Sequence, residues 1–174
     1  MMTKIEFEKL SLQDALDLAV LIEQEAYERY TQFAEQLGNR YKDDAGDFFK
    51  TMAGYELEHA SQLRKRREKL FGQSPSRVKM DMIWDVEAPS EGSVRSYMSP
   101  RQAMDLALQS EIKAYQFFDQ ALSHVQDKEV RSLFEELRSE EKQHQELLQK
   151  RIAQLPKSTG PDLTEDDVDE PGEY

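Results

Sequence analysis

Two short motifs carry the residues of this chain that are best suited to chemistry. Glu56-x-x-His59 and Glu141-x-x-His144 each place a carboxylate and an imidazole three residues apart. On a helix, residues with this spacing lie one turn apart on the same face. One such motif most often belongs to a solvated helix face. Two copies in a chain with only three histidines favour metal binding.

Each motif also has a glutamate upstream, Glu23 for the first and Glu111 for the second. Two glutamates and two Glu-x-x-His motifs, one from each of four helices, form the ligand set of dinuclear carboxylate sites in helical bundles. The predicted metal ligands are Glu23, Glu56, His59, Glu111, Glu141 and His144. We expect Glu56 and Glu141 to bridge the two ions, and Glu23 and Glu111 to be terminal ligands.

The types of these residues indicate which ions they would hold. Four buried, ionised and unpaired carboxylates would strongly destabilise the fold. Two divalent cations would balance their charge, with the two neutral imidazoles completing the shell. Mixed oxygen and nitrogen ligands with open positions suit iron or manganese and the activation of O₂ or peroxide.

The first two of these residue groups fall on predicted helices. Apolar residues recur in steps of three and four over residues 12–37, with Glu23 the one acid on the stripe, which predicts a helix with one face in a core. Ser11 and Asp14 resemble a capping box at its start, and Gly38 ends it. After a turn at 39–43, a second helix carries Glu56-x-x-His59 and ends at Gly72.

The second half of the chain repeats this plan. Ser99, Pro100 and Gln102 predict the start of a third helix, Asp127 caps a fourth, and Pro156 ends it. Residues 73–98 between the halves lack helical periodicity, and their length fits a crossover between two parallel helices. The predicted fold is all-α: a four-helix bundle over residues 11–156, made of two helical hairpins.

An internal repeat places the motifs at one level. Adding 88 to Glu23 gives Glu111, and adding 85 to the first Glu-x-x-His motif gives the second. In each hairpin the upstream glutamate and the motif are about equally far from the turn. Both sets should therefore lie at the same height, and a pseudo-twofold axis would bring all six side chains together.

Several residues near the motifs have competing interpretations. Glu25 rivals Glu23, but it falls off the apolar stripe and aligns with Lys113, so we expect it in solvent. Tyr30 lies on the stripe two turns after Glu23, where hydrogen bonding to a ligand carboxylate and simple core packing are about equally expected. The third histidine, His124, is expected at the C-terminal end of the third helix, interacting with its dipole.

Composition limits the other classes of function. A net charge of −12 argues against nucleic acid and anionic membranes as partners. The absence of cysteine excludes disulfides and iron–sulfur or rubredoxin-type centres in this chain. No apolar leader or bilayer-length stretch is visible, so a cytoplasmic location is expected. Residues 1–10 are expected as a loose lead-in, and 157–174 as a disordered acidic tail.

With these motifs, residues 11–155 resemble the ferritin-like superfamily, and most closely its rubrerythrin-type members. The resemblance implies a di-iron site with ferroxidase or peroxide-reducing activity. Ala114 stands where rubrerythrins carry a further ligand glutamate. Bacterioferritins have a haem-ligating methionine directly after the second-helix glutamate, and Leu57 stands there, so no haem is expected.

The function expected is oxidation of Fe(II) by O₂ or H₂O₂ at two iron ions, with manganese as an alternative metal. Such a protein would serve iron handling or oxidative-stress defence, with an electron donor that the sequence does not identify, and would form a homodimer. One alternative is a di-iron or di-manganese oxygenase acting on an organic substrate. Another is a bundle that holds metal only for structure and acts as an interaction module.

Overall fold

The computed structural model describes residues 5–38, 44–83, 86–89, 92–94 and 98–155. These residues form two short 3₁₀ turns, four α-helices and no strand. The turns are η1 (Phe7–Lys9) and η2 (Met80–Met82), and the helices are α1 (Leu12–Leu37), α2 (Ala45–Phe71), α3 (Pro100–Leu122) and α4 (Lys128–Gln154). The predicted all-α fold is confirmed. The predicted first turn, the Pro156 stop and the acidic tail lie outside the described residues.

The helix ends follow the capping signals. The Ser11 side chain accepts a hydrogen bond from the backbone N–H of Asp14, and Ser99 and Gln102 form a reciprocal capping box at the start of α3. The Asp127 carboxylate caps α4. Gly38 and Gly72 end α1 and α2 at positive φ, which glycine adopts without strain. Local sequence therefore sets the helix boundaries.

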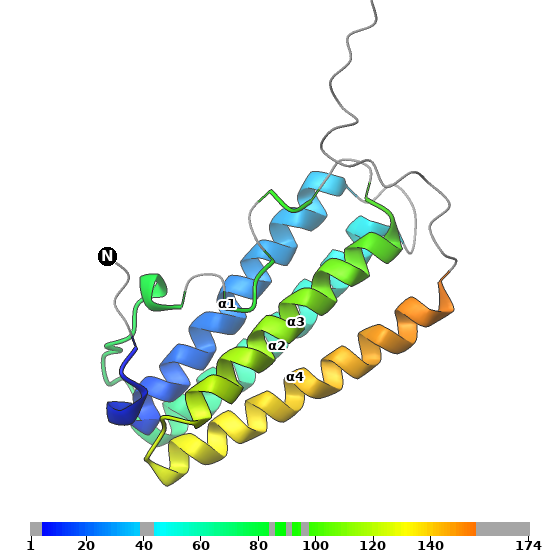
Figure 1. Cartoon of the computed structure of the whole chain (residues 1–174). Coiled ribbons are helices and arrows are strands. Elements are labelled where there is room, and N and C mark those ends of the chain that lie inside the picture. The colour runs from blue at the N-terminus through cyan, green and yellow to red at the C-terminus, as the bar shows by residue number, and fades with distance from the viewer. Residues whose placement is uncertain (1–4, 39–43, 84–85, 90–91, 95–97, 156–174) are drawn as a thin grey trace, which may run out of the picture.

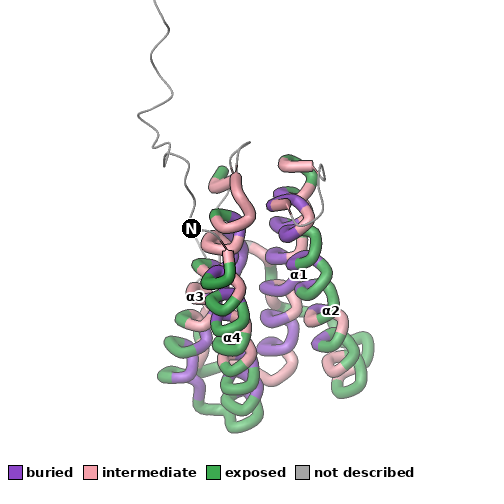
Figure 2. The backbone as a smooth tube through the Cα atoms, turned by 90° about the vertical axis from the view of Figure 1, so that its right-hand side faces the viewer, coloured by how far each residue is buried: buried purple, intermediate pink, exposed green. Residues whose placement is uncertain are grey.

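The four helices form one bundle of two antiparallel hairpins, α1–α2 and α3–α4 (Figure 1). The described parts of residues 73–98 lie along the bundle, and α2 and α3 run in the same direction, as predicted for a crossover. Figure 2 shows the buried residues as a stripe along the inward side of each helix. The amphipathic faces are thereby removed from water, which is the main favourable term in folding.

The aromatic core lies in two clusters. One contains Phe118 and Phe134, with ring centroids 5.4 Å apart. The other contains Tyr30, Phe33 and Phe49. Close-packed apolar clusters hold backbone positions firmly, so the glutamates on the same helix stripes have little freedom to move apart.

The start of the described chain differs from the expected loose lead-in. Phe7, in η1, places its ring edge-on to Phe117 at 5.7 Å and near Phe134 at 6.5 Å. Ile5 and Leu10 also pack against this core cluster. Apolar side chains spaced irregularly give no helical signal, but they still gain free energy by covering the end of a core.

Ion pairs and hydrogen bonds hold the first residues of the crossover against α1. Arg67 of α2 pairs with Asp17 at 2.7 Å and also donates to backbone carbonyls of Gly72 and Ser74. Arg77 pairs with Asp14 at 2.6 Å. These contacts direct the chain back along α1 and α3, the side on which Figure 1 shows it. None of the described helices combines the length and apolar character needed to cross a bilayer.

Candidate metal centre

The four helical glutamates of the predicted site are all buried. Glu23, Glu56, Glu111 and Glu141 are 3%, 1%, 0% and 2% exposed, and each comes from a different helix. Ionisable side chains are rarely buried to this extent unless they are paired or bind a metal ion.

Within each hairpin, the histidine faces both glutamates. His59 Nδ1 lies 3.6 Å from Glu23 Oε2 and 3.7 Å from Glu56 Oε2. His144 faces Glu111 and Glu141 in the same way in the other hairpin. In each Glu–Glu–His set, one ligand atom from each residue lies within 4.8 Å of the others. The structure thus brings together the three residues predicted in each hairpin.

The second set is slightly tighter than the first. His144 Nδ1 lies 3.0 Å from Glu111 Oε2, a hydrogen-bond distance, and 3.6 Å from Glu141 Oε2. The backbone carbonyl of Glu111 also accepts a hydrogen bond from the buried side chain of Gln145. In both hairpins the same ring nitrogen, Nδ1, is directed at two carboxylates, which is the position from which an imidazole would bind an ion held between them.

The two sets meet across the bundle. The rings of His59 and His144 stack with centroids 5.0 Å apart and planes 3° from parallel. Both side chains are about a quarter exposed, unlike the glutamates. The site is therefore deep on its carboxylate side and reaches the surface at the imidazoles, between α2 and α4.

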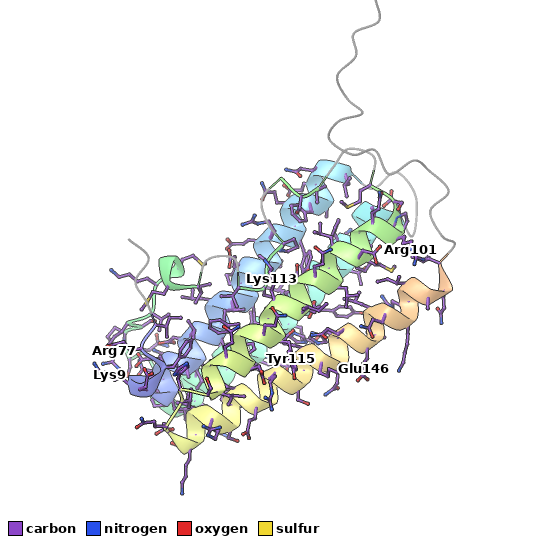
Figure 3. The ribbon with its side chains drawn as sticks, in the orientation of Figure 1. Lys9, Arg77, Arg101, Lys113, Tyr115 and Glu146 are labelled. Carbon is purple, nitrogen blue, oxygen red and sulfur yellow. The ribbon has the colours of Figure 1, made fainter. Side chains whose placement is uncertain are left out.

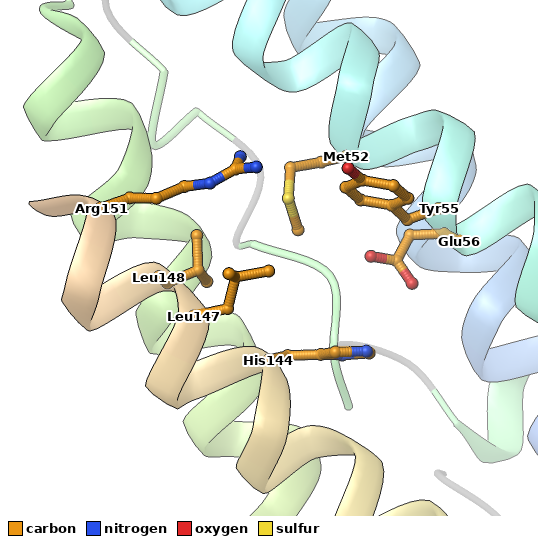
Figure 4. A pocket seen from close by; sticks show the side chains of 7 residues that line it. All are labelled: Met52, Tyr55, Glu56, His144, Leu147, Leu148 and Arg151. Atoms are coloured by element: carbon orange, nitrogen blue, oxygen red, sulfur yellow. The ribbon is translucent and has the colours of Figure 1, made fainter.

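A small pocket adjoins this exposed edge. Its volume accessible to water-sized molecules is about 30 Å³, and Figure 4 shows Glu56 and His144 pointing toward each other across it. Met52, Leu147 and Leu148 supply apolar walls, and the remaining lining residues are Tyr55 and Arg151. The pocket gives a molecule the size of water a place beside two predicted ligands.

The carboxylate oxygens show that the site suits cations. In the described part of the chain, both oxygens of Glu56 and one oxygen each of Glu23, Glu111 and Glu141 are buried without a hydrogen-bond partner. A buried acceptor left unpaired costs about 1–3 kcal/mol, and more when it is charged. Metal ions would satisfy these oxygens together. The donor set, carboxylate oxygen with imidazole nitrogen, suits two iron or manganese ions.

The protonation of the site follows from its crowding. The carboxylates of Glu23 and Glu56 raise the pKa of His59 to about 10. Burial acts to lower the pKa of His144, but its hydrogen bonds with Glu111 and Glu141 outweigh this and raise it to about 10. Burial raises the pKa of Glu56 to about 8 and that of Glu141 well above its usual value. Protons thus hold the place of cations when metal is absent.

The metal-free protein should lose stability as pH rises from about 6 to about 9. The raised pKa values of His59, His144 and Glu56 mean that the folded state keeps these protons to a higher pH than the unfolded chain does. Each such proton lowers the free energy of unfolding by up to about 1.4 kcal/mol per pH unit. Urea unfolding in the presence of a chelator measures the slope.

The metal-loaded protein provides the control for this prediction. Ions compete with the same protons, so its stability should rise with pH over that range. A metal-free protein whose free energy of unfolding increases between these pH values would contradict the protonation pattern described above.

One sequence expectation near the site is wrong. Glu25 is buried at 5% exposure, with Arg29 at 3.9 Å, and does not face solvent. Its repeat counterpart Lys113 donates to the carbonyl of Ala88 in the crossover, so the crossover covers the face that helix periodicity alone would leave open. Away from the site, His124 follows the C-terminal end of α3, as expected, and its Nδ1 is 3.4 Å from Glu8 Oε1. Its interaction with the helix dipole stays a prediction.

Tyr30 lies next to the centre and packs in the core at the same time. Its ring stacks on Phe49 at 5.8 Å, and the side chain is fully buried. Burial, with the nearby charges of Glu111 and Glu56, raises the pKa of Tyr30 well above its usual value, so it remains a neutral phenol. The repeat has Phe118 at the matching position, so the second hairpin has no such hydroxyl.

The structure adds one residue that sequence reasoning missed. Glu87, in the crossover, is 1% exposed and has a carboxylate oxygen close to those of the helical glutamates. The crossover is neither a helix nor a strand, so no regular spacing of apolar residues shows which of its positions are buried. A single acid between Val86 and Ala88 is the one sequence signal, and it is a weak one.

Comparisons with known proteins agree with this arrangement. The family model described as Rubrerythrin matches residues 14–152, which include all six predicted ligands. No curated protein matches the sequence. A crystal structure of an uncharacterized conserved protein from Magnetospirillum magnetotacticum MS-1 is similar, with 26% identity and a TM-score of 0.68. The similarity covers 86% of this chain and 99% of that one.

Proposed function

Because this chain belongs to the rubrerythrin family, we propose that it is a non-haem di-iron oxidoreductase that oxidises Fe(II) with O₂ or H₂O₂. One observation carries the proposal: two Glu–Glu–His sets, from two hairpins, face each other, and several of their carboxylate oxygens are buried without a hydrogen-bond partner among the described residues. Two bound cations would stabilise such a site strongly. Without them, its buried carboxylates lack groups that balance their charge.

Each side chain has a defined part in this function. Glu23, Glu56 and His59 would hold one iron ion, and the equivalent residues of the second hairpin would hold the other. When bound, two Fe(II) ions supply the two electrons that convert H₂O₂ and two protons to two molecules of water. The apolar walls around the pocket keep bulk water away from Glu56, which strengthens the electrostatic interactions inside.

The pocket beside Glu56 and His144 has room for a small oxidant. Its volume of about 30 Å³ is suited to a molecule such as O₂ or H₂O₂. A larger pocket of about 180 Å³ borders His59, so pocket size does not separate this reaction from that of an oxygenase for an organic substrate. We propose the ferroxidase or peroxidase reaction on the basis of the family and the metal centre.

Anaerobic titration with Fe(II), followed by a stoichiometric pulse of H₂O₂ or O₂, tests the proposal. Two iron ions per chain should be bound and then oxidised together, and the ferric absorption should develop faster than in buffer. Metal analysis of protein purified without added metal would separate iron from manganese. Binding of two ions without turnover by either oxidant would favour a structural metal site and an interaction module.

Replacing Tyr30 with phenylalanine should slow oxidation without preventing metal binding. The phenol is neutral and buried beside the ligand carboxylates, so it can donate a hydrogen bond or a proton there. Loss of one such donor reduces a rate by about 10²–10³-fold where it acts on the transition state, and less where it acts through a ligand. Stopped-flow absorption after Fe(II) loading measures the rate.

The matched variant is Phe118→Tyr, which adds a hydroxyl at the repeat position of the other hairpin. It should bind two ions and leave the rate close to that of the wild type. An unchanged rate in Tyr30→Phe would limit Tyr30 to its packing against Phe49.

A further inference from the structure

The crossover carries a glutamate into the middle of the bundle. Glu87 is 1% exposed, and its neighbours Ile83 and Ala88 are fully buried. The backbone N–H of Val86 donates to the carbonyl of Ile83 at 3.2 Å, which turns the chain immediately before Glu87. The backbone around Glu87 is therefore fixed by apolar burial and a local turn.

A contact with α3 fixes the other side of Glu87. Lys113, whose place on α3 is labelled in Figure 3, donates from Nζ to the carbonyl of Ala88 at 2.8 Å. Ala114 and its repeat counterpart Ala26 are fully buried one turn after Glu111 and Glu23, and they offer only methyl groups. These two helix positions thus provide no further carboxylate, and the crossover provides one.

The carboxylate of Glu87 reaches both hairpins. A carboxylate oxygen of Glu87 lies within 4.8 Å of ligand atoms of Glu23 and Glu141, which are equally close to each other, and Glu87 forms a second group of this kind with Glu56 and Glu111. Every helical glutamate of the centre is therefore a neighbour of Glu87.

Both oxygens of Glu87 lack a hydrogen-bond partner in the described part of the chain. A carboxyl group that served only to fix the crossover would be expected to accept hydrogen bonds from the backbone or from a cationic side chain, as Asp14 and Asp17 do on α1. A further carboxylate beside four other carboxyl groups is costly unless cations balance the charge.

We propose that Glu87 is a fifth carboxylate ligand of the dinuclear centre, supplied by the crossover and placed between the two hairpins. This inference rests on the proposed metal site, but not on the identity of the oxidant. The crossover then closes the centre on the side of α1 and α3, and the two imidazoles lie at the open side, between α2 and α4.

A fifth carboxylate changes the charge balance of the centre. Five carboxylates exceed the charge of two divalent ions by one and fall short of that of two trivalent ions by one. Glu87 therefore stabilises the oxidised pair more than four carboxylates alone would. It also links metal binding to the order of the crossover, because the ion and the segment around residue 87 hold each other in place.

Binding of Co(II) and Mn(II), measured by calorimetry and visible absorption, tests the role of Glu87 without any oxidation. Wild type should bind two ions per chain. Glu87→Gln, which keeps the shape of the side chain, should lose affinity for at least one ion by about tenfold or more. Glu58→Gln removes an equal charge from an exposed position on α2 and should bind like the wild type.

Hydrogen exchange provides a second readout. Peptides covering residues 86–89 should become protected in the wild type when Mn(II) is added, and this protection should be lost or reduced in Glu87→Gln. Equal isotherms for wild type and Glu87→Gln, together with no metal-dependent protection of these peptides, would overturn the inference and leave the six-residue centre intact. A wild type that binds no metal would overturn the proposed function itself.

Discussion

Replacing Glu56 with glutamine should reduce Fe(II) oxidation to the rate seen in buffer and leave at most one ion bound per chain. Both oxygens of Glu56 are buried and unpartnered, and the residue belongs to a group with Glu23 and His59 and to another with Glu87 and Glu111. All four helical glutamates belong to two such groups, but Glu56 is the one of the four whose two oxygens are both buried without a hydrogen-bond partner in the described part of the chain, so it would contribute most to holding the ions. An amide oxygen carries no charge to hold them.

Two comparisons make this result specific. Glu141→Gln, at the equivalent position of the second hairpin, should have a similar effect, whereas Glu58→Gln should oxidise iron normally. Circular dichroism checks the fold, which the substitution should not harm in metal-free protein, because Glu56 is costly to ionise in its buried position. Oxidation by Glu56→Gln at the wild-type rate would refute the assignment of this residue.

Metal loading should raise the thermal midpoint of unfolding by about 15 °C or more. A ligand at about a thousand times its Kd adds about 4 kcal/mol for each site filled, provided that it does not bind the unfolded chain. For a chain of this size, about 1 kcal/mol corresponds to about 2–4 °C. The ligands come from two hairpins and from the crossover, so ions join segments that the chain connects only through loops.

Calorimetric scans with a chelator, then with Mn(II) or Fe(II) under anaerobic conditions, measure this change. The shift should be larger at about pH 8 than at about pH 6, because protons compete with the ions for the same carboxylates and imidazoles. A double variant, Glu23→Gln with Glu111→Gln, serves as the control and should show little shift. An equal midpoint with and without metal in the wild type would contradict a site that spans the bundle.

The sequence alone predicted much of this molecule because its signals are local or periodic. Serine and aspartate caps, glycine stops and the three-and-four spacing of apolar residues define each helix without reference to the others. The repeat then supplies the tertiary information. Residues equally far from a hairpin turn lie at the same height, so the convergence of Glu23 with Glu56 and His59 follows from counting along the chain.

Only the tertiary structure decided what the crossover does. Its path depends on contacts between residues far apart in sequence, such as Arg77 with Asp14 and Lys113 with Ala88, and no periodic pattern encodes such pairs. That path buries Glu87 within the centre. The periodicity of the sequence shows which face of a helix is apolar, but whether a residue is buried depends on the segments that pack against it. Glu25 lies off the apolar face of α1 and is nevertheless buried.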